Sequence, residues 1–393
     1  MTVKITKPEI NVREQLTELR AGTSSTTTPN YLGRRNLIIN GDMRIAQRGT
    51  LVSGVTSNNR IGPDRSRVDC SSSGTHTISQ STDSPTNFKY SWKLQCTTAQ
   101  ASPNQLRYSY AVEGNDVSHL GYGTSDASPL TLSFWVKSNV VGIYALSIET
   151  HVSSRYFSTN YTIDNAGVWE YKTIYIPGDK VSGLNADNTL GLYLSWWLAS
   201  HTGLKTNPVD NTWVTDSSYT NLVGSAMNVN MASSTSNSWQ ITGVQLEKGK
   251  VDTPFEHRSY AEELNSCLRY YEDFQPGMFG IFGNGRGIGQ SGIAVVSVPI
   301  FPKRTAPSVS MDALADTTLA SRSGYSVPYS IGATFIFIGT RDVSTERNCS
   351  IALYYNKPSS WSTIEPLSLI QNVVTPGGVI TEGQGKLIFD AEI

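Results

Sequence analysis

Short runs that alternate between apolar and polar residues dominate this sequence up to about residue 256. In YSWKLQC, residues 90 to 96, every second side chain is aromatic or apolar, and LTLSFWVKS, residues 130 to 138, repeats the pattern. A period of two places the apolar side chains of a strand on one face of a sheet. Further candidate strands, each bounded by Gly, Pro, Asn or Asp, are VVGIYALSIET, WEYKTIYIPG, LGLYLSWWLA and SWQITGVQLEKG. Because no helical pattern separates them, residues 31 to 256 are predicted to form a mainly β domain, an antiparallel sandwich of jelly-roll type.

The N-terminal residues 1 to 30 have a different pattern. We expect a short helix followed by the polar linker AGTSSTTTPN, with Val12, Leu16 and Leu19 on one helix face. A helix this short is marginally stable alone, so its apolar face needs a partner. This face is therefore the candidate for oligomerisation or for docking onto another protein.

The chain after residue 256 is predicted to contain a helix and a second β domain. In HRSYAEELNSCLRYYEDF, residues 257 to 274, Ser259 and Glu262 form a capping box, which is typical of a helix start. This helix is expected to connect the two β domains. Residues 275 to 393 return to short strands with Gly and Pro between them, which predicts a smaller C-terminal β-sandwich.

Charge and hydropathy exclude several classes of protein. Lys and Arg number 31 against 32 Asp and Glu, which argues against a nucleic-acid partner or a polybasic membrane anchor. The longest apolar runs are shorter than the ~20 residues of a membrane span, and the N-terminus lacks the apolar core of a signal peptide. The four cysteines are far apart in sequence, as expected of buried free thiols.

No sequence pattern of an enzyme stands out. The five histidines are dispersed without metal-ligand spacing, and no G-x-S-x-G motif occurs. GIGQSG, residues 287 to 292, precedes an apparent strand rather than a helix, which excludes a dinucleotide site. A carboxylate pair facing across a groove is not visible in sequence spacing. We therefore expect no enzymatic activity and no cofactor, and the sequence leaves open whether calcium or another metal binds.

Aromatic side chains are the best candidates for a binding site. Trp135 lies on the polar face of its predicted strand, Tyr193 and Trp197 share one face of LGLYLSWWLA, and Trp213 lies in a predicted loop. Aromatic rings stack on the C–H faces of sugars, while nearby polar groups bond the hydroxyls. The alternative is that the outward rings pack against a neighbouring subunit. The other tryptophans expected to fill the core are Trp92, Trp169 and Trp239.

Several longer strings resemble a family of bacteriophage tail-fibre and receptor-binding proteins. These are RNLIINGDMRIAQRGT, LTLSFWVKSNVVGIYALSI, YTIDNAGVWEYKTIYIPGD and WQITGVQLEKGKVDTPFEHRSYAEELNSCLRYYE, and the ending Asp-Ala-Glu plus a small apolar residue is similar too. The resemblance implies a jelly roll related to carbohydrate-binding modules, in a fibre on the virion surface. It also implies a homotrimer, with the N-terminal element attached to other virion proteins and the C-terminal domain as a candidate distal receptor-binding unit.

The string RNLIINGDMRIAQRGT, residues 35 to 50, becomes the first strand of the jelly roll under this resemblance, with Asn40-Gly41-Asp42 as a bend. Its polar side chains Arg44, Gln47 and Arg48 either face sugar groups or, as we favour, fix the register of this segment by pairing with neighbouring backbone.

These observations together predict a virion fibre protein that attaches to a host-surface glycan by shape, stacking and hydrogen bonds. The first alternative is an architectural virion protein, such as a head fibre or decoration protein, without a ligand. The second is a depolymerase that cleaves host polysaccharide, which would need a pair of carboxylates ~5–10 Å apart.

Overall fold

The computed structural model describes residues 34–150, 152, 154–205, 210–220, 222–274, 281–288, 293–299, 301–305, 307–311, 317–321, 326–327, 336–337, 348–354, 366–371 and 387–393. The predicted N-terminal helix, with Val12, Leu16 and Leu19, lies outside the described residues.

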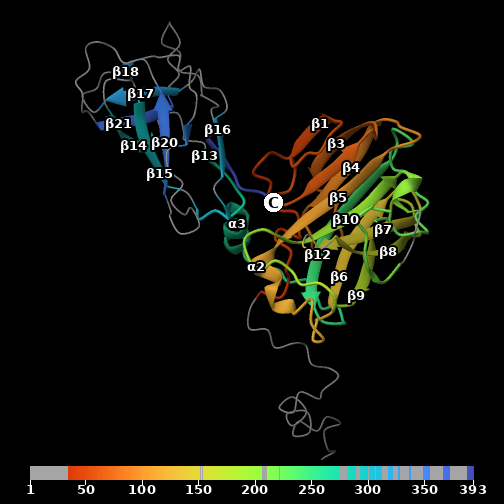
Figure 1. The fold of residues 1–393 in the computed structure, drawn as a ribbon. Helices are drawn as coiled ribbons and strands as arrows, with labels where there is room; N and C mark the ends of the chain where they lie inside the picture. The colour runs from red at the N-terminus through yellow and green to blue at the C-terminus, as the bar shows by residue number, and fades with distance from the viewer. Residues whose placement is uncertain are drawn as a thin grey trace, which may run out of the picture.

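Two six-stranded antiparallel sheets pack face to face as a β-sandwich, which confirms the predicted fold class (Figure 1). Sheet A contains, in spatial order, β1 (Leu51–Val55), β3 (Thr75–Ser81), β4 (Ser91–Thr98), β12 (Ser238–Lys248), β6 (Leu130–Ser138) and β9 (Glu170–Ile176). Sheet B contains β11 (Trp213–Thr215), β8 (Arg155–Ile163), β7 (Gly142–Thr150), β10 (Leu190–Ser200), β5 (Gln105–Glu113) and β2 (Arg67–Ser71). The short helices α2 (Gly114–Val117), η1 (Ser118–Leu120) and η2 (Thr202–Leu204) lie in connections.

The inner faces of the two sheets bury the alternating apolar residues. In β6, the side chains of Leu130, Leu132, Phe134 and Val136 are fully buried, while Trp135 and Lys137 point to the outer face of sheet A. This is the arrangement that the alternation in LTLSFWVKS predicts. Burial of these side chains supplies the main stabilisation of the sandwich.

An aromatic cluster occupies the centre of this core. The Tyr108 ring lies 4.9 Å from Trp92 and 5.3 Å from Trp196, and Trp239 lies 6.1 Å from Trp92, all between ring centroids. Burial of Trp92 and Trp239 confirms the prediction for these two. The prediction for Trp169 is wrong, because Trp169 is only half-buried, and it immediately precedes edge strand β9.

The string RNLIINGDMRIAQRGT is not a strand. Residues 34 to 50 form bends and turns, with positive φ angles at Asn40 (59°) and Met43 (60°). The bend at Asn40 is as expected, but the backbone of the segment bonds largely to side chains instead of to a neighbouring strand. The Glu256 carboxylate, for example, accepts the backbone N–H groups of Arg35 and Asn36.

The region after the sandwich begins with a shorter helix than predicted. Helix α3 (Tyr260–Leu268) starts with the predicted capping box between Ser259 and Glu262. The chain then enters strand β13 (Tyr271–Phe274), so the predicted helix ends early. Strand β13 pairs with β22 (Leu387–Asp390), which also pairs with β16 (Ser308–Met311).

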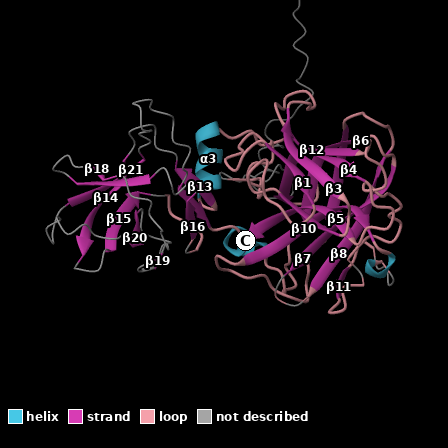
Figure 2. Cartoon of the chain, turned by 90° about the horizontal axis from the view of Figure 1, so that it is seen from above, coloured by secondary structure: helices cyan, strands magenta, loops and turns pink. Residues whose placement is uncertain are grey.

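The remaining described strands of this region form a seven-stranded antiparallel sheet (Figure 2). In spatial order they are β18 (Ser326–Val327), β17 (Thr317–Ser321), β21 (Pro366–Gln371), β14 (Ile281–Ile288), β15 (Ile293–Pro299), β20 (Asn348–Tyr354) and β19 (Ile336–Phe337). Strand β22 and residues 391–393 return to the large sandwich, where Glu392 pairs with arginines of the opening segments, and Figure 1 shows this end of the chain beside the sandwich. The boundary predicted at residue 275 therefore does not separate all later residues from the sandwich. Within the described parts of the chain, no helix is long and apolar enough to cross a membrane.

Candidate functional site

An aromatic groove lies on the outer face of sheet A, with a volume of about 660 Å³. Its lining residues are Thr86, Asn87, Phe88, Ser133, Trp135, Tyr171, Gly243, Pro254, Phe255 and His257. Strands β6, β9 and β12 form its floor, the loop between β3 and β4 forms one wall, and the segment after β12 forms another. The volume is within the range of about 300–1,000 Å³ that is usual for small-ligand sites.

Aromatic rings form two groups in this groove. Trp135 on β6 and Tyr171 on β9 are cross-strand partners, with ring centroids 5.3 Å apart. Phe88, Phe255 and His257 come from the two walls, with centroid distances of 5.1 Å between the two phenylalanines and 4.9 Å between Phe255 and His257. These rings present apolar faces, and Trp135, Tyr171 and His257 also carry polar atoms at the ring edge. This combination suits a ligand that has both apolar faces and hydroxyl groups.

Gly243 allows the two groups of rings to approach each other. It lies at an irregularity in the pairing of β12 with β6, and its φ angle is +61°. A Cβ atom at this position would lie 2.7 Å from the Phe88 ring and 3.1 Å from the Trp135 ring. Both the positive φ and the close ring contacts therefore require glycine here.

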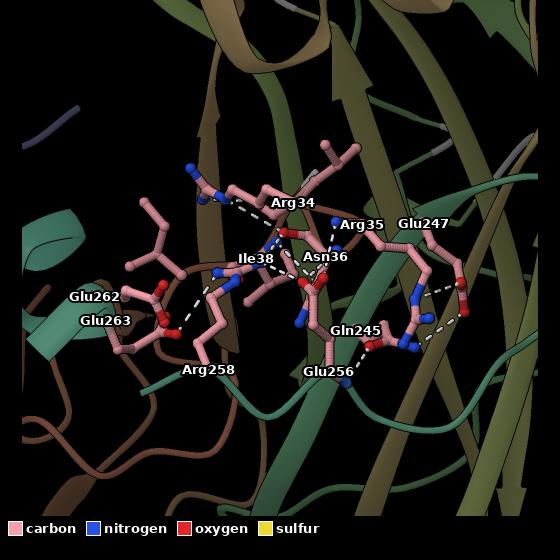
Figure 3. Close-up of polar contacts among 12 residues, drawn as sticks. Arg34, Arg35, Asn36, Ile38, Gln245, Glu247, Glu256, Arg258, Glu262 and Glu263 are labelled. Carbon is pink, nitrogen blue, oxygen red and sulfur yellow. Dashed lines mark hydrogen bonds and ion pairs between the residues drawn. The ribbon is translucent and has the colours of Figure 1, made fainter. Parts of the chain in front are cut away.

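A polar network attaches the wall segment to β12 and to the opening segment (Figure 3). The Glu247 carboxylate accepts the backbone N–H of Thr253 at 2.9 Å and its hydroxyl at 2.7 Å. The Gln245 amide donates to the Thr253 carbonyl at 3.0 Å. The Arg35 guanidinium donates to the Pro254 carbonyl at 2.7 Å and lies 3.5 Å from Glu247. These contacts fix the backbone directly before Phe255.

Glu256 extends the network to the other side of Phe255. Its carboxylate accepts the backbone N–H groups of Arg35 at 3.0 Å and Asn36 at 2.9 Å, and pairs with Arg258 at 2.8 Å. Burial opposes ionisation of Glu256, but the two N–H donors and the Arg258 charge outweigh it and lower the pKa of this carboxyl. The strings RNLIIN and GVQLEKG…TPFEHRSY thus meet in one network, and its role here is to position the wall that carries Phe255 and His257.

Two carboxylates border the groove, and both have structural partners. Asp42 pairs with Arg44 at 2.9 Å; burial raises the pKa of Asp42, against the opposing charges of Arg44 and His257. Asp252 accepts a hydrogen bond from the Tyr171 hydroxyl at 3.1 Å. In the described parts of the chain, no group of three or more His, Cys, Asp or Glu residues is arranged to hold a metal ion.

Of the four predicted ligand-contacting residues, the structure places Trp135 in the groove. Tyr193 is half-buried on sheet B, and its hydroxyl donates to Asp69 at 2.5 Å. Trp197 is fully buried and donates to the Ser147 hydroxyl at 2.8 Å. The expectation of a shared ligand-contacting surface at positions 193 and 197 is therefore corrected: Trp197 is closed to solvent.

Trp213 also belongs to the interior. Its ring packs 5.8 Å from both Tyr122 and Phe157, and its indole N–H donates to the Pro177 carbonyl at 2.6 Å. Only 8% of Trp213 is exposed. Trp213 packs the start of β11 against the core and is not an exposed loop residue, because its ring and its N–H both have partners within the fold.

Sequence reasoning missed most of the groove. Tyr171 was identifiable, because alternation in WEYKTIYI places it on the outer face with its neighbour Tyr175. Phe88, Phe255 and His257 come from irregular segments, where no periodicity shows which way a side chain points. The preferred prediction, pairing with backbone, is confirmed for two residues: Arg44 donates to the Arg258 carbonyl at 2.6 Å and Gln47 donates to the Tyr271 carbonyl at 3.1 Å. Arg48 pairs instead with the carboxylates of Asp390 and Glu392.

No protein-family model matches the sequence, and no curated protein matches it. Among solved structures, the chain is similar to the enzymatically active domain of tailspike protein 4 of bacteriophage CBA120, with 11% identity, a TM-score of 0.28, and coverage of 55% of this chain and 21% of that chain.

Two further similar structures contain carbohydrate-binding modules. A family 11 module of a cellulosomal cellulase from Clostridium thermocellum has 12% identity and a TM-score of 0.26, covering 55% of this chain and 97% of that chain. A tandem of two family 22 modules from Paenibacillus barcinonensis has 9% identity and a TM-score of 0.26, covering 91% of this chain and 97% of that chain. These values assign neither a family nor a ligand to the chain.

Proposed function

We propose that this protein is a glycan-binding adhesin that acts without covalent chemistry, and that the aromatic groove on sheet A is its binding site. The observation that carries the proposal is the convergence of Trp135, Tyr171, Phe88, Phe255 and His257 on one groove of about 660 Å³. A sugar ring stacks on such aromatic surfaces, and its hydroxyls bond to polar groups at the edges.

Polar side chains that line the groove beside the aromatic rings support this assignment. Asn87 and Thr86 lie on the loop wall, Ser133 lies beside Trp135 on β6, and His257 is exposed at the opposite wall. Hydroxyl, amide and imidazole groups both donate and accept hydrogen bonds, as sugar hydroxyls do. The two nearby carboxylates, Asp42 and Asp252, hold Arg44 and Tyr171, which favours a binding role over a catalytic one.

The biological setting in this proposal is a bacteriophage virion, with the protein as a fibre, of the tail-fibre type, that attaches to the host surface. The sequence strings similar to phage tail-fibre and receptor-binding proteins support this setting. A homotrimer belongs to the same proposal, because three weak sites on one particle can raise avidity by ~10²–10⁴-fold where geometry permits.

The experiment is size-exclusion chromatography of the full chain mixed with purified bacterial lipopolysaccharide or capsular polysaccharide, following both protein and sugar. We expect co-elution with the polysaccharide length unchanged. Trp135→Ala should abolish co-elution. Tyr219→Ala is the matched control, since Tyr219 is a half-exposed ring that packs 5.9 Å from Tyr156 on sheet B.

Other outcomes would change the assignment. Shortening of the polysaccharide would show a depolymerase. Separate elution across a panel of envelope polysaccharides, with trimers confirmed by mass measurement, would contradict glycan attachment and favour an architectural virion protein.

A further inference from the structure

A second row of side chains continues the groove along the outer face of sheet A. Lys137 follows Trp135 by two residues on β6 and therefore lies on the same face. On β12, Gln240 pairs with Lys137 as Thr242 pairs with Trp135. On the other side, Tyr171 pairs with Trp135, so Trp169, two residues earlier, comes opposite Lys137.

Asp83 holds this second row together. Its carboxylate accepts hydrogen bonds from the Lys137 ammonium at 2.8 Å, the Trp169 indole N–H at 3.1 Å and the Gln240 amide at 3.0 Å. The Lys137 nitrogen lies 5.9 Å from the centre of the Trp169 ring. The hydrogen bond to Asp83 therefore fixes the orientation of Trp169, and Asp83 itself remains partly exposed to solvent.

The two rows contact the same loop between β3 and β4 and form one continuous surface. Asp83 belongs to the same β3–β4 loop that carries Phe88, a wall of the groove. Neighbouring rows on a strand are separated by two residues, about 6.8 Å. Trp135 and Trp169 are diagonal neighbours on adjacent strands, a position that separates residues by about 7–8 Å. This spacing is comparable with the size of one sugar ring.

We propose that Trp169, with Asp83 and Lys137, forms a second subsite that binds the next sugar of a glycan chain already seated on Trp135 and Tyr171. This deepens the proposed function and rests on it. The site then binds a stretch of a linear glycan and gains affinity with chain length. The Asp83 carboxylate already accepts four hydrogen bonds, so its role is to hold Trp169 and Lys137 in place. The Asp83–Lys137 pair carries no net charge, which suits a neutral sugar, and the Lys137 ammonium can donate to a sugar hydroxyl.

The test uses the O-polysaccharide of a lipopolysaccharide that the wild-type chain binds, partially hydrolysed and separated into single sugars and oligosaccharides. Isothermal titration calorimetry of the full chain is compared with Trp169→Ala. We expect Trp169→Ala to lower the oligosaccharide affinity about tenfold, in line with the loss of one stacking contact, and to leave single-sugar affinity within about twofold. Trp135→Ala should lower both.

A conservative variant separates stacking from support of the fold. Trp169→Phe keeps an aromatic ring without the N–H group and should recover most of the oligosaccharide affinity, and circular dichroism confirms that each variant is folded. The second subsite is wrong if Trp169→Ala loses affinity equally for single sugars and oligosaccharides, or for neither. Either result would still leave the groove as the proposed binding site. If the wild-type protein binds none of the envelope polysaccharides in the panel, lipopolysaccharide and capsular polysaccharide included, the proposed function itself fails.

Discussion

The Arg65 guanidinium forms an ion pair with the Glu392 carboxylate, joining residues that are 327 positions apart in the chain. Arg48 and Arg60 also pair with Glu392, at 3.3 Å and 3.5 Å. The Arg65 and Glu392 side chains are almost fully buried. This cluster ties the end of strand β22 to the opening segment of the sandwich.

Removing the Glu392 charge should destabilise the fold. Glu392→Gln leaves three arginines without their shared carboxylate, and the loss of one partner of a buried pair costs about 3–5 kcal/mol in free energy of unfolding. Urea unfolding measures the change. The control is Asp164→Asn, which removes an exposed ion pair with Lys172 and should change stability by less than about 1 kcal/mol.

The same pair predicts a pH dependence. Burial opposes ionisation of Glu392, but the charges of Arg65, Arg48 and Arg60 outweigh it and lower its pKa below the ordinary value of 4.5. The stabilisation is therefore complete above pH 4.5 and is lost as the pH falls through the lowered pKa. The free-energy gap between wild type and Glu392→Gln should be constant near neutral pH and close on acidification. A gap that widens in acid would contradict this ion pair.

Gly243→Ala should damage the groove specifically. The positive φ of 61° disfavours alanine by about 1–2 kcal/mol, and the new Cβ would displace the Phe88 ring. We expect lower thermal stability and weaker glycan binding. The matched control is Gly167→Ala, where φ is +74° and no atom lies within 4 Å of the added Cβ. That variant should lose stability without losing binding.

Trp197→Ala should mainly reduce stability, whereas Trp135→Ala should mainly reduce glycan binding. Trp197 is fully buried, so its truncation should cost about 3–5 kcal/mol in free energy of unfolding. Trp135 is half-buried at the groove, so its truncation should cost less stability and abolish glycan binding. Thermal denaturation and polysaccharide co-elution, measured on both variants, check this contrast. Selective loss of binding in a fully stable Trp197→Ala variant would contradict the placement of the site.

The described cysteine thiols should resist modification. Cys70, Cys96 and Cys267 are buried and free. Burial, assisted by the Asp69 charge, raises the pKa of Cys70 to about 11, and burial raises the pKa of Cys267 well above its ordinary value. Alkylation of the native protein at pH 8 should leave these three peptides unlabelled, whereas urea should expose them. Labelling of Cys70 under native conditions would show that β2 opens.

The sequence by itself determined the strands in which apolar and polar residues alternate, and the inner and outer faces of those strands. Alternation is a local property, and a pleated strand turns it directly into an inner and an outer face, as the buried Phe134 and the outward Trp135 show. It also determined the start of α3, because the capping box of Ser259 and Glu262 lies within one turn of chain.

Only the tertiary structure decided what each outward side chain meets. Trp197 and Trp135 both occupy outer faces in the sequence pattern, yet one is covered and the other lines a groove. The Trp197 ring has the Arg107 guanidinium of the neighbouring strand β5 over it, 4.9 Å from the ring centroid. Trp135 instead faces an irregular wall that carries Phe255, whose position is fixed by hydrogen bonds to residues more than two hundred positions away. Such contacts leave no periodic signal in the sequence, because their partners become neighbours only when the chain folds.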